Sequence, residues 1–236
     1  MMRMLPSGVV LLALMCACGG GDDDGSAGAA DAGGDDGCDE GAALPDGWRP
    51  VDGLAGGTVT STVDGDVVES LIDASAGGFG NSDSEPFLYV SFDDGLLLAQ
   101  ELTDVAAFDD GSWDLAFKRY VIRANGGDSG TGGVSVADVA ADTLEEVTAP
   151  PADGAFGVDR WTDESCFPVG DGIGGPRTQF TDWYDITDMI LTPKPLVYVV
   201  RRSGRGDWKL EIEDYYADEG DPEKSGVYRV RWAPLE

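Results

Sequence analysis

Hydrophobic and polar positions alternate along much of this chain with the two-residue period of β-strands. The clearest group lies late in the sequence, where residues 196–202 and 208–216 flank a turn that contains glycine, and residues 227–232 form a third run. In the second run Leu210 and Ile212 fall on one face, and charged residues occupy the positions between and beside them. The pattern predicts antiparallel strands with one buried face and one solvated face.

The solvated face of this group carries charges of both signs. Glu211 and Glu213 lie on it in one run, and Arg229 and Arg231 lie on it in the next. If the two runs are neighbouring strands, the arginines face the glutamates in cross-strand ion pairs, each worth only about 0.2–1 kcal/mol. We therefore interpret these charges as a solvated sheet surface and not as a binding site.

Two further pairs of apolar runs flank turns rich in aspartate and glycine. The connection at residues 64–65 is typical of a type I′ hairpin, because both positions tolerate a positive φ angle, and residues 93–95 predict a second hairpin with a three-residue turn. The paired runs are 58–63 with 66–72, and 87–92 with 96–102. Residues 138–147 and 187–191 are each expected to hold at most a short helix. The predicted fold class is all-β, with antiparallel hairpins that form a sandwich or a curled open sheet and at most a minor helix.

The N-terminal residues have the pattern of a secretory signal peptide. Arg3 provides a positive charge, residues 9–15 form a short apolar run, and Ala17-Cys18 follows it. The run is far shorter than the roughly 20 residues that a membrane-spanning helix needs. Because a bacterial lipoprotein signal is cleaved between a small residue and the cysteine that receives the lipid, we expect residues 1–17 to be such a signal peptide and Cys18 to be the lipid anchor. The rest of the chain would then lie outside the cytoplasm.

The composition changes abruptly at Gly47. Residues 19–46 carry nine acids, no base and almost no bulky apolar residue, so we predict residues 18–46 to be a lipidated, disordered tether. Residues 47–236 hold all six tryptophans, and their 14 bases against 36 acids leave a net charge of −22. We expect them to form a single acidic domain. This charge argues against binding to nucleic acid or to anionic lipid surfaces, which require basic patches.

Three cysteines remain after removal of the predicted signal peptide. Cys18 is expected to carry the lipid, which leaves Cys38 and Cys166 as an even pair in a compartment where disulfides persist. A bridge between them would attach the end of the tether to the domain. Two free thiols are the alternative, because separation in sequence does not determine the distance between two residues.

The chain contains no histidine, which excludes several kinds of chemistry. Ser-His-Asp and Cys-His catalysis, histidine-ligated zinc and mononuclear iron sites with two histidines all need imidazole groups. The glycine-rich residues 126–133 lack the lysine of a phosphate-binding loop and are interpreted as a flexible loop. Asp182, Asp185 and Asp188 permit a carboxylate-dependent hydrolase, but acids are frequent enough here to cluster by chance. We predict no metal site, and we expect a protein that holds a ligand and is not an enzyme.

Two segments carry motifs that resemble a known protein family. The first is SWDLAFKRYVIRANGG at residues 112–127, which a glycine-rich loop follows. The second comprises the aromatic pair at 183–184, the run PLVYVVR at 195–201, a strand that ends in two tyrosines at 215–216, and YRVRW at 228–232. In their residues, order and spacing these segments resemble the HmuY-like family of haem-binding bacterial lipoproteins.

The resemblance implies an all-β lipoprotein of the outer membrane, at its periplasmic or cell-surface face. Such a protein captures haem or another porphyrin for iron acquisition and passes it to an outer-membrane uptake receptor. Family members hold the haem iron between two axial side chains, histidine in one branch and methionine in others. This chain has no histidine, and after signal removal Met189 is its only methionine. The candidate haem ligands are therefore Met189, Lys118 and Tyr120.

The missing ligands also lead to a second interpretation. A surface lipoprotein with the same fold that has lost its haem ligands would bind another ligand or a protein partner. The two hypotheses differ in their response to haemin, because only a haem carrier is expected to shift the Soret band in a saturable way.

Overall fold

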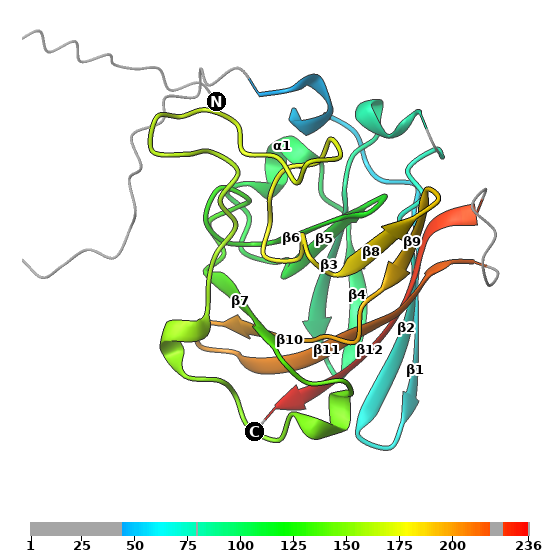
Figure 1. Cartoon of the computed structure of the whole chain (residues 1–236), viewed down its shortest axis with the longest axis vertical. Helices are drawn as coiled ribbons and strands as arrows, with labels where there is room; N and C mark the ends of the chain where they lie inside the picture. Colours follow the sequence, from blue (N-terminus) through cyan, green and yellow to red (C-terminus); the bar gives the residue numbers. More distant parts are fainter. Residues whose placement is uncertain (1–43, 79, 218–223, 236) are drawn as a thin grey trace, which may run out of the picture. The chain divides into compact units, whose positions relative to one another are not determined.

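The computed structural model describes residues 44–78, 80–217 and 224–235. Within them the chain forms two antiparallel sheets, a separate two-stranded hairpin and a few short helical turns (Figure 1). The predicted all-β fold class is confirmed. The predicted signal peptide, Cys18 and Cys38 lie outside the described residues.

The larger sheet is built around the late group of strands. All of its neighbouring strands pair antiparallel, in the order β1-β2-β12-β11-β10-β7. Its strands are β1 (Val59–Asp64), β2 (Val67–Asp73), β7 (Val134–Val139), β10 (Val197–Arg202), β11 (Gly206–Tyr216) and β12 (Ser225–Leu235). The hairpins predicted around residues 64–65 and 203–206 therefore both form. The predicted type I′ turn at residues 64–65 is wrong, because Asp64 pairs with Val67 and the turn consists of Gly65 and Asp66, of which only Gly65 has a positive φ angle.

The smaller sheet has four strands in the order β4-β3-β5-β6. They are β3 (Leu88–Asp93), β4 (Leu96–Gln100), β5 (Leu115–Lys118) and β6 (Val121–Ala124). Asp93 pairs with Leu96, so the turn between β3 and β4 contains only Asp94 and Gly95, with φ angles of 48° and 74°. The predicted three-residue turn is wrong, because Asp93 still belongs to the ladder.

The main core lies between the inner faces of the two sheets. Phe92 of the smaller sheet packs against Trp232 of β12, and Phe117 packs against Tyr228, with ring centroids 5.0 and 5.2 Å apart. These inward positions are those that the alternating pattern places on the apolar face of each strand. The predicted burial of Leu210 and Ile212 is confirmed.

Short helical turns are few, as the sequence predicts. The only α-helix of the described residues is α1 (Asp104–Ala107), capped by the side chain of Thr103, and four 3-10 turns accompany it. They are η1 (Asp46–Trp48), η2 (Ser82–Ser84), η3 (Leu144–Glu146) and η4 (Asp153–Ala155). The helix expected within 138–147 is reduced to η3. The one expected at 187–191 is wrong, because these residues form the turn between β8 (Tyr184–Thr187) and β9 (Ile190–Pro193).

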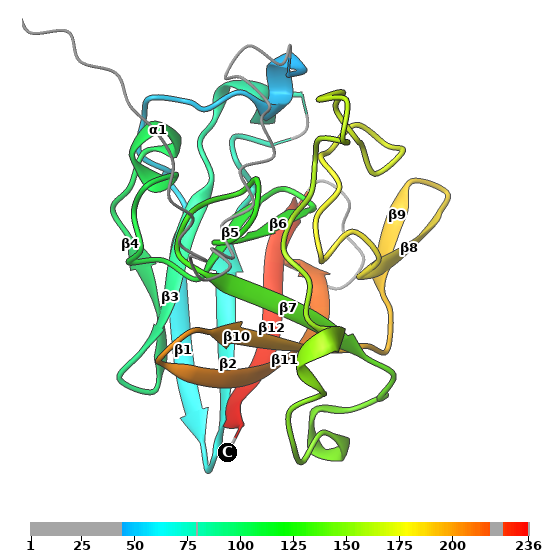
Figure 2. The same ribbon diagram turned by 90° about the vertical axis from the view of Figure 1, so that its left-hand side faces the viewer.

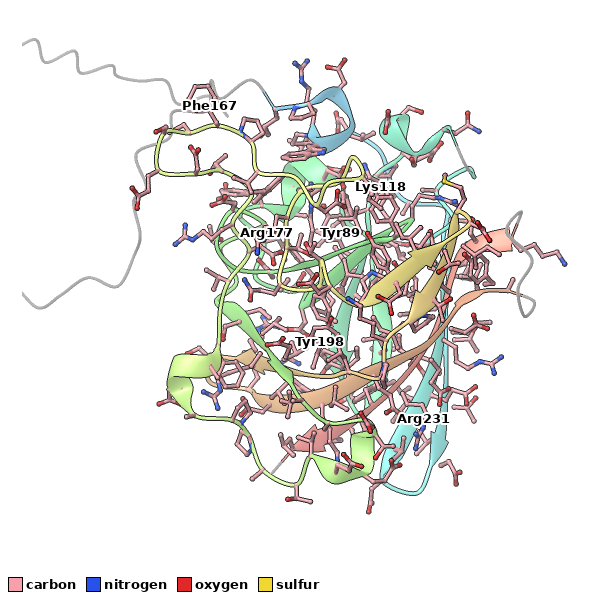
Figure 3. All side chains as sticks on the ribbon, viewed as in Figure 1. Tyr89, Lys118, Phe167, Arg177, Tyr198 and Arg231 are labelled. Atoms are coloured by element: carbon pink, nitrogen blue, oxygen red, sulfur yellow. The ribbon has the colours of Figure 1, made fainter. Side chains whose placement is uncertain are left out.

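The charged face of β11 and β12 is a solvated ladder of ion pairs. Glu211 pairs in register with Arg231, whose guanidinium also bonds Glu145 at 2.6 Å. Arg229 lies 3.9 Å from Glu69 of β2. Arg231 lies far from Lys118 and Phe167 in Figure 3. The interpretation of these charges as a sheet surface is thereby supported.

The Trp-Asp-Leu-Ala-Phe motif connects the two sheets. Asp114 is fully buried, and its carboxylate accepts a hydrogen bond from the backbone N–H of Phe92 at 2.8 Å and from Arg202 of β10 at 2.8 Å. Trp113 donates its indole N–H to the carbonyl of Ala107 at 2.7 Å. The motif therefore stabilises the fold at the junction between the sheets. No helix among the described residues is long and apolar enough to cross a membrane.

Candidate functional site

The candidate ligands Lys118, Tyr120 and Met189 belong to two hairpin turns. Lys118 and Tyr120 lie at the turn between β5 and β6, and Met189 lies at the turn between β8 and β9. Figures 1 and 2 show the β8–β9 hairpin at the half of the domain that also holds η1 and the loop 158–181. We define the candidate site as these two turns together with the adjoining residues 171–176.

The β5–β6 turn is held to the larger sheet by Arg119. This residue has a φ angle of 51°, and its guanidinium bonds the carbonyl and the hydroxyl of Ser225, both at 2.7 Å. The hydroxyl of Tyr228 donates to the carbonyl of Arg119 at 2.6 Å. These buried bonds hold the positions of the neighbouring Lys118 and Tyr120.

Tyr120 belongs to an aromatic cluster that also includes the family-like pair Trp183-Tyr184. The ring centroids of Tyr120 and Tyr184 lie 6.1 Å apart, and Trp183 donates its indole N–H to the carbonyl of Tyr120 at 2.9 Å. The Tyr120 hydroxyl donates to the carbonyl of Ile173 at 3.4 Å. Burial, with a contribution from Asp171, raises the pKa of the Tyr120 phenol above its usual value. Ionisation to a phenolate, the form that binds iron best, is therefore unfavourable here.

Met189 lies at the tip of the β8–β9 hairpin. Thr187 pairs with Ile190, so Asp188 and Met189 form a two-residue turn with φ angles of 51° and 66°. The side chain of Met189 is 79% exposed, the largest exposure of any apolar side chain that the structure describes as exposed. The thioether is thus accessible to a ligand from solvent.

The hairpin that carries Met189 is attached both near its tip and at its base. The hydroxyl of Tyr216 on β11 accepts a hydrogen bond from the N–H of Leu191 at 2.8 Å. At the other end, the N–H of Lys194 donates to the carbonyl of Trp183 at 2.8 Å. Ile186 and Ile190 remain exposed near the tip. The base of the hairpin is therefore fixed, while its tip presents apolar side chains and a sulfur atom to solvent.

Lys118 is a buried residue, although a charge in an alternating strand usually faces solvent. Its side chain donates to the carbonyl of Glu85 at 3.1 Å and to that of Gly47 at 3.5 Å, and its Nζ lies 4.6 Å from the ring centroid of Phe87. Burial lowers the pKa of its ammonium group. The structure therefore brings Lys118 and Tyr120 together around one cavity, but it directs the amine of Lys118 towards two backbone carbonyls.

A second charged residue, Arg123, is buried on the same face of the smaller sheet as Lys118, and the sequence did not predict its burial. Only 6% of it is exposed, and its guanidinium lies 4.0 Å from the ring centroid of Phe87 and 4.2 Å from that of Trp161. Alternation places Arg123 on the same outward face as Lys118, which predicts exposure. Residues that are distant in sequence, such as Trp48 and Trp161, form a second layer over this face, and no local pattern signals such a layer.

The cavities of the candidate site are small. The cavity that Lys118 and Tyr120 share has about 50 Å³, and the one between Tyr120 and Tyr184 has about 10 Å³. Small-molecule sites usually enclose about 300–1,000 Å³. A porphyrin would therefore have to bind against the outer surface of the two turns, and Met189 is the candidate that such a ligand reaches directly.

The described part of the chain shows no group arranged as a metal site, and the three aspartates considered for a hydrolase do not form a buried cluster. No group of three or more acids or cysteines is arranged there to hold a metal ion. Asp182, Asp185 and Asp188 are all exposed, and Asp185 pairs with Lys194 at 3.7 Å. Cys166 is disulfide-bonded. Its predicted partner, Cys38, lies outside the described residues, so that pairing stays a prediction.

Several solved structures are similar to this chain, and the first of those described here shows the same fold. A protein of Bacteroides fragilis NCTC 9343 that has been proposed to be a lipoprotein is 19% identical to this chain, with a TM-score of 0.51, and the match covers 74% of this chain and 94% of that one. A protein of Bacteroides vulgatus ATCC 8482, proposed to be an HmuY-like haem-binding protein, is 16% identical with a TM-score of 0.48 over 72% of this chain and 93% of that one. The apo form of the HmuY analogue of Tannerella forsythia is 15% identical with a TM-score of 0.47 over 76% and 97%. No curated protein matches the chain.

The family model described as HmuY protein matches residues 83–229, which contain the first motif, all but the last three residues of the second, the two turns of the candidate site and the junction between the sheets. This match extends over more than half of the chain. The protein therefore belongs to the HmuY family.

Proposed function

We propose that this protein is a lipid-anchored, extracytoplasmic haem-binding protein that captures haem or a related porphyrin and passes it to an outer-membrane uptake receptor. Two observations support the proposal: the membership of the HmuY family and the position of Met189. It acts as a carrier and not as an enzyme. The bound iron would be its cargo.

The observation that carries the proposal is the conformation of Met189. A residue other than glycine, asparagine or aspartate is uncommon at the φ angle of 66° that Met189 adopts, and this backbone conformation costs about 1 kcal/mol. Burial of apolar surface does not offset this cost, because Met189 is 79% exposed. A large apolar residue that is both strained and solvated suggests a functional constraint. A thioether is also a soft ligand that suits haem iron.

The remaining candidates have subordinate roles in this proposal. Tyr120 and Tyr184 provide aromatic surface at the base of the hairpin, where the porphyrin ring would pack. Lys118 could become an axial ligand only after leaving the carbonyls of Glu85 and Gly47. We therefore assign Met189 as the single protein ligand and expect the other axial position to be open to solvent or to a partner.

The proposed anchor rests on the sequence alone. Residues 1–17 would be removed as a lipoprotein signal peptide, Cys18 would receive the lipid, and residues 18–46 would link it to the domain of residues 47–236. We place the protein at the outer membrane, on its periplasmic or cell-surface face. Mass spectrometry of the mature protein tests this assignment, because a lipidated N-terminus at Cys18 is expected.

Titration with haemin tests the proposed ligand. The wild type is expected to give a saturable shift of the Soret band with one haem per chain. Met189→Leu keeps the apolar volume and removes only the sulfur, so we expect it to lose the spectrum of a thioether-ligated iron and to bind at least about tenfold less tightly. Leu98→Met, at an exposed strand position of similar character, serves as the control and should match the wild type.

Two further variants test whether Tyr120 or Lys118 also acts as a ligand of the haem iron. Tyr120→Phe removes only the hydroxyl, and Lys118→Ala removes the amine together with the alkyl chain that carries it. If Met189 is the ligand, both should retain the wild-type Soret position. A wild-type titration indistinguishable from that of free haemin would contradict the proposed function.

A further inference from the structure

A separate polar surface lies on the loop 158–181. Short extended segments of this loop pair with one another: the N–H of Val169 donates to the carbonyl of Trp161 at 2.7 Å, and the N–H of Arg177 donates to that of Val169 at 2.9 Å. The pairing brings two arginines to one open concavity of about 270 Å³. We call this surface the arginine hollow, and its lining residues are Arg160, Thr162, Val169, Arg177, Thr178 and Gln179.

The arginine hollow has the charge and the hydrogen-bonding groups to receive carboxylates. Arg160 lies 3.5 Å from Asp128, whose other oxygen is held by the backbone N–H groups of Trp161 and Thr162. Arg177 makes no side-chain hydrogen bond or ion pair with any residue that the structure describes. The chain as a whole has a net charge of −30. The two guanidinium groups of the arginine hollow complement acidic residues.

The disulfide bond of Cys166 indicates which segment of the chain lies near the arginine hollow. It lies in the turn that joins two of the paired segments, in the same loop as the labelled residues Phe167 and Arg177 (Figure 3), and it is disulfide-bonded. The other cysteines of the chain are Cys16, Cys18 and Cys38, all of which precede the first described residue. Cys16 belongs to the predicted signal peptide and Cys18 is the predicted lipid site. Cys38 is the partner that remains.

The length of the intervening chain restricts the position of residues 39–43. The first described residue is Leu44, and the nearby Trp48 lies 6.4 Å from Trp161 and donates its indole N–H to the carbonyl of Gly174 at 2.8 Å. Six residues span at most about 20–22 Å when fully extended. A chain that starts at a Cys38–Cys166 bridge and continues to Leu44 therefore stays within this distance of Cys166, in the neighbourhood of the loop 158–181.

We propose that residues 38–43 lie along the arginine hollow, with Cys38 bonded to Cys166 and with the carboxylates of Asp39 and Glu40 facing Arg160 and Arg177. The disulfide holds one end of the segment, and Trp48 holds the other. The occupant of this surface is thus the acidic end of the chain's own tether. The lipid-linked part of the tether then leaves the domain at Cys166 and not at Leu44.

This attachment would fix how the domain faces the membrane. A tether held only at Leu44 leaves the domain free to turn about one point, whereas a segment held by a disulfide and by ion pairs restricts it. Residues 171–176, which form part of the candidate haem site, belong to the same loop. The proposal is independent of haem binding, because each of its tests is made without haem.

A peptide map under non-reducing conditions, made on the full-length chain exported by its own signal, tests the bridge. We expect one linked pair of peptides that contain Cys38 and Cys166. Equilibrium titration with dithiothreitol then tests the ion pairs. Reduction gives two protein thiols, and the reagent is oxidised to its cyclic disulfide. Arg160→Gln and Asp39→Asn/Glu40→Gln should each shift the equilibrium about two- to fivefold towards the dithiol.

A double-mutant cycle distinguishes direct ion pairs between Arg160 and the acids from the general effect of changing the net charge. If the acids face Arg160, combining the arginine and the acid substitutions should cost no more than either change alone. Arg229→Gln removes an equal charge from the distant β12 surface and should leave the equilibrium unchanged. The proposal is overturned if Cys38 is unbridged or is bonded to another cysteine. It is equally overturned if the effects of the two changes multiply, or if Arg229→Gln acts as strongly as Arg160→Gln.

Discussion

At the scale of single residues, the domain depends on a few buried charges whose role is structural. Asp159 is fully buried and accepts hydrogen bonds from the N–H of Ala124, the hydroxyl of Ser129 and the N–H of Gln179. It thereby joins the end of β6 to the glycine-rich loop and to the loop 158–181. Burial raises its pKa to about 6, although these bonds and Arg123 act in the opposite direction.

The raised pKa of Asp159 predicts how stability depends on pH. The folded state binds this proton more tightly than the unfolded state, whose carboxyl has a pKa near 4. The contribution of Asp159 to stability should therefore increase as the pH falls through about 6, level off below about 4, and amount to roughly 2–3 kcal/mol. Chemical denaturation of the wild type and of Asp159→Asn across this range measures it.

The difference in unfolding free energy between the two proteins isolates this residue from the many other acids. Asp52→Asn, at an exposed position, should follow the wild type at every pH. A difference between the wild type and Asp159→Asn that stays constant from pH 4 to pH 7 would show that Asp159 keeps an ordinary pKa.

The ion pair between Asp114 and Arg202 leads to a second prediction. Arg202→Ala leaves the fully buried carboxylate of Asp114 without its charged partner, so unfolding free energy should fall by about 3–5 kcal/mol. Arg229→Ala removes a solvated pair with Glu69 and should cost less than about 1 kcal/mol. Urea denaturation compares the two, and equal losses would contradict the role given to Asp114.

Sequence analysis predicted some of these residues and missed others for a physical reason. The alternating pattern correctly separates Leu210 and Ile212 from Glu211. It cannot identify Asp114, Asp159 or Arg123 as buried, because their partners come from segments far away in sequence. Burial of a charge is decided by tertiary contacts, whereas periodicity reports only which residues share a face.

At the scale of elements, hairpin turns determine both the fold and the candidate site. Turn chemistry predicted a hairpin at residues 64–65, and the hairpin forms with its turn one residue later, at Gly65-Asp66, where glycine supplies the positive φ angle. It did not predict the β8–β9 hairpin, because Asp188-Met189 lacks the glycine typical of such a turn. The unusual residues of this turn draw attention to Met189 only once the structure shows the hairpin.

The conformation of Met189 predicts a conflict between stability and function. Met189→Gly relieves a positive φ angle of 66° at an exposed position, so unfolding free energy should rise by about 0.5–1 kcal/mol. Haemin should then no longer give the Soret shift of the wild type. Thermal unfolding and haemin titration of the same variant measure both effects.

Thr187→Gly provides the control within the same hairpin. Thr187 belongs to β8, where glycine weakens a strand, so this variant should lose stability. If Met189→Gly also loses stability, the strain that we assign to the turn is absent.

At the scale of the whole molecule, the dominant feature is the negative charge. A net charge of −30 keeps the protein soluble but opposes the compact state through self-repulsion. Raising the concentration of sodium chloride from about 10 mM to 200 mM shortens the Debye length from about 30 Å to below 10 Å. We therefore expect Tm, followed by circular dichroism, to rise by a few degrees.

A variant with fewer acids tests the cause of that rise. Asp52→Asn, Asp66→Asn and Glu101→Gln replace three exposed acids, and together they should make the rise smaller. A Tm that falls with salt in the wild type would show that attractive ion pairs, such as those of Arg231, outweigh the repulsion.

The overall architecture could be predicted further than the binding site. The two motifs indicated the family, and the alternating pattern indicated an antiparallel β-fold. The packing of Lys118 against Phe87 and of Arg123 against Trp161 required the complete chain path. Identifying the ligand requires a binding measurement as well, because the candidate site is an open surface and not an enclosed pocket.

The most direct test of the central claim is the absorption spectrum of the full-length protein as isolated from a haem-replete source. A chain that carries haem through Met189 is predicted to show a Soret band with about one haem per protein, and the band should be lost or displaced in Met189→Leu isolated in the same way. A wild-type protein that is isolated without any Soret band, and that acquires none when haemin is added, would contradict the account.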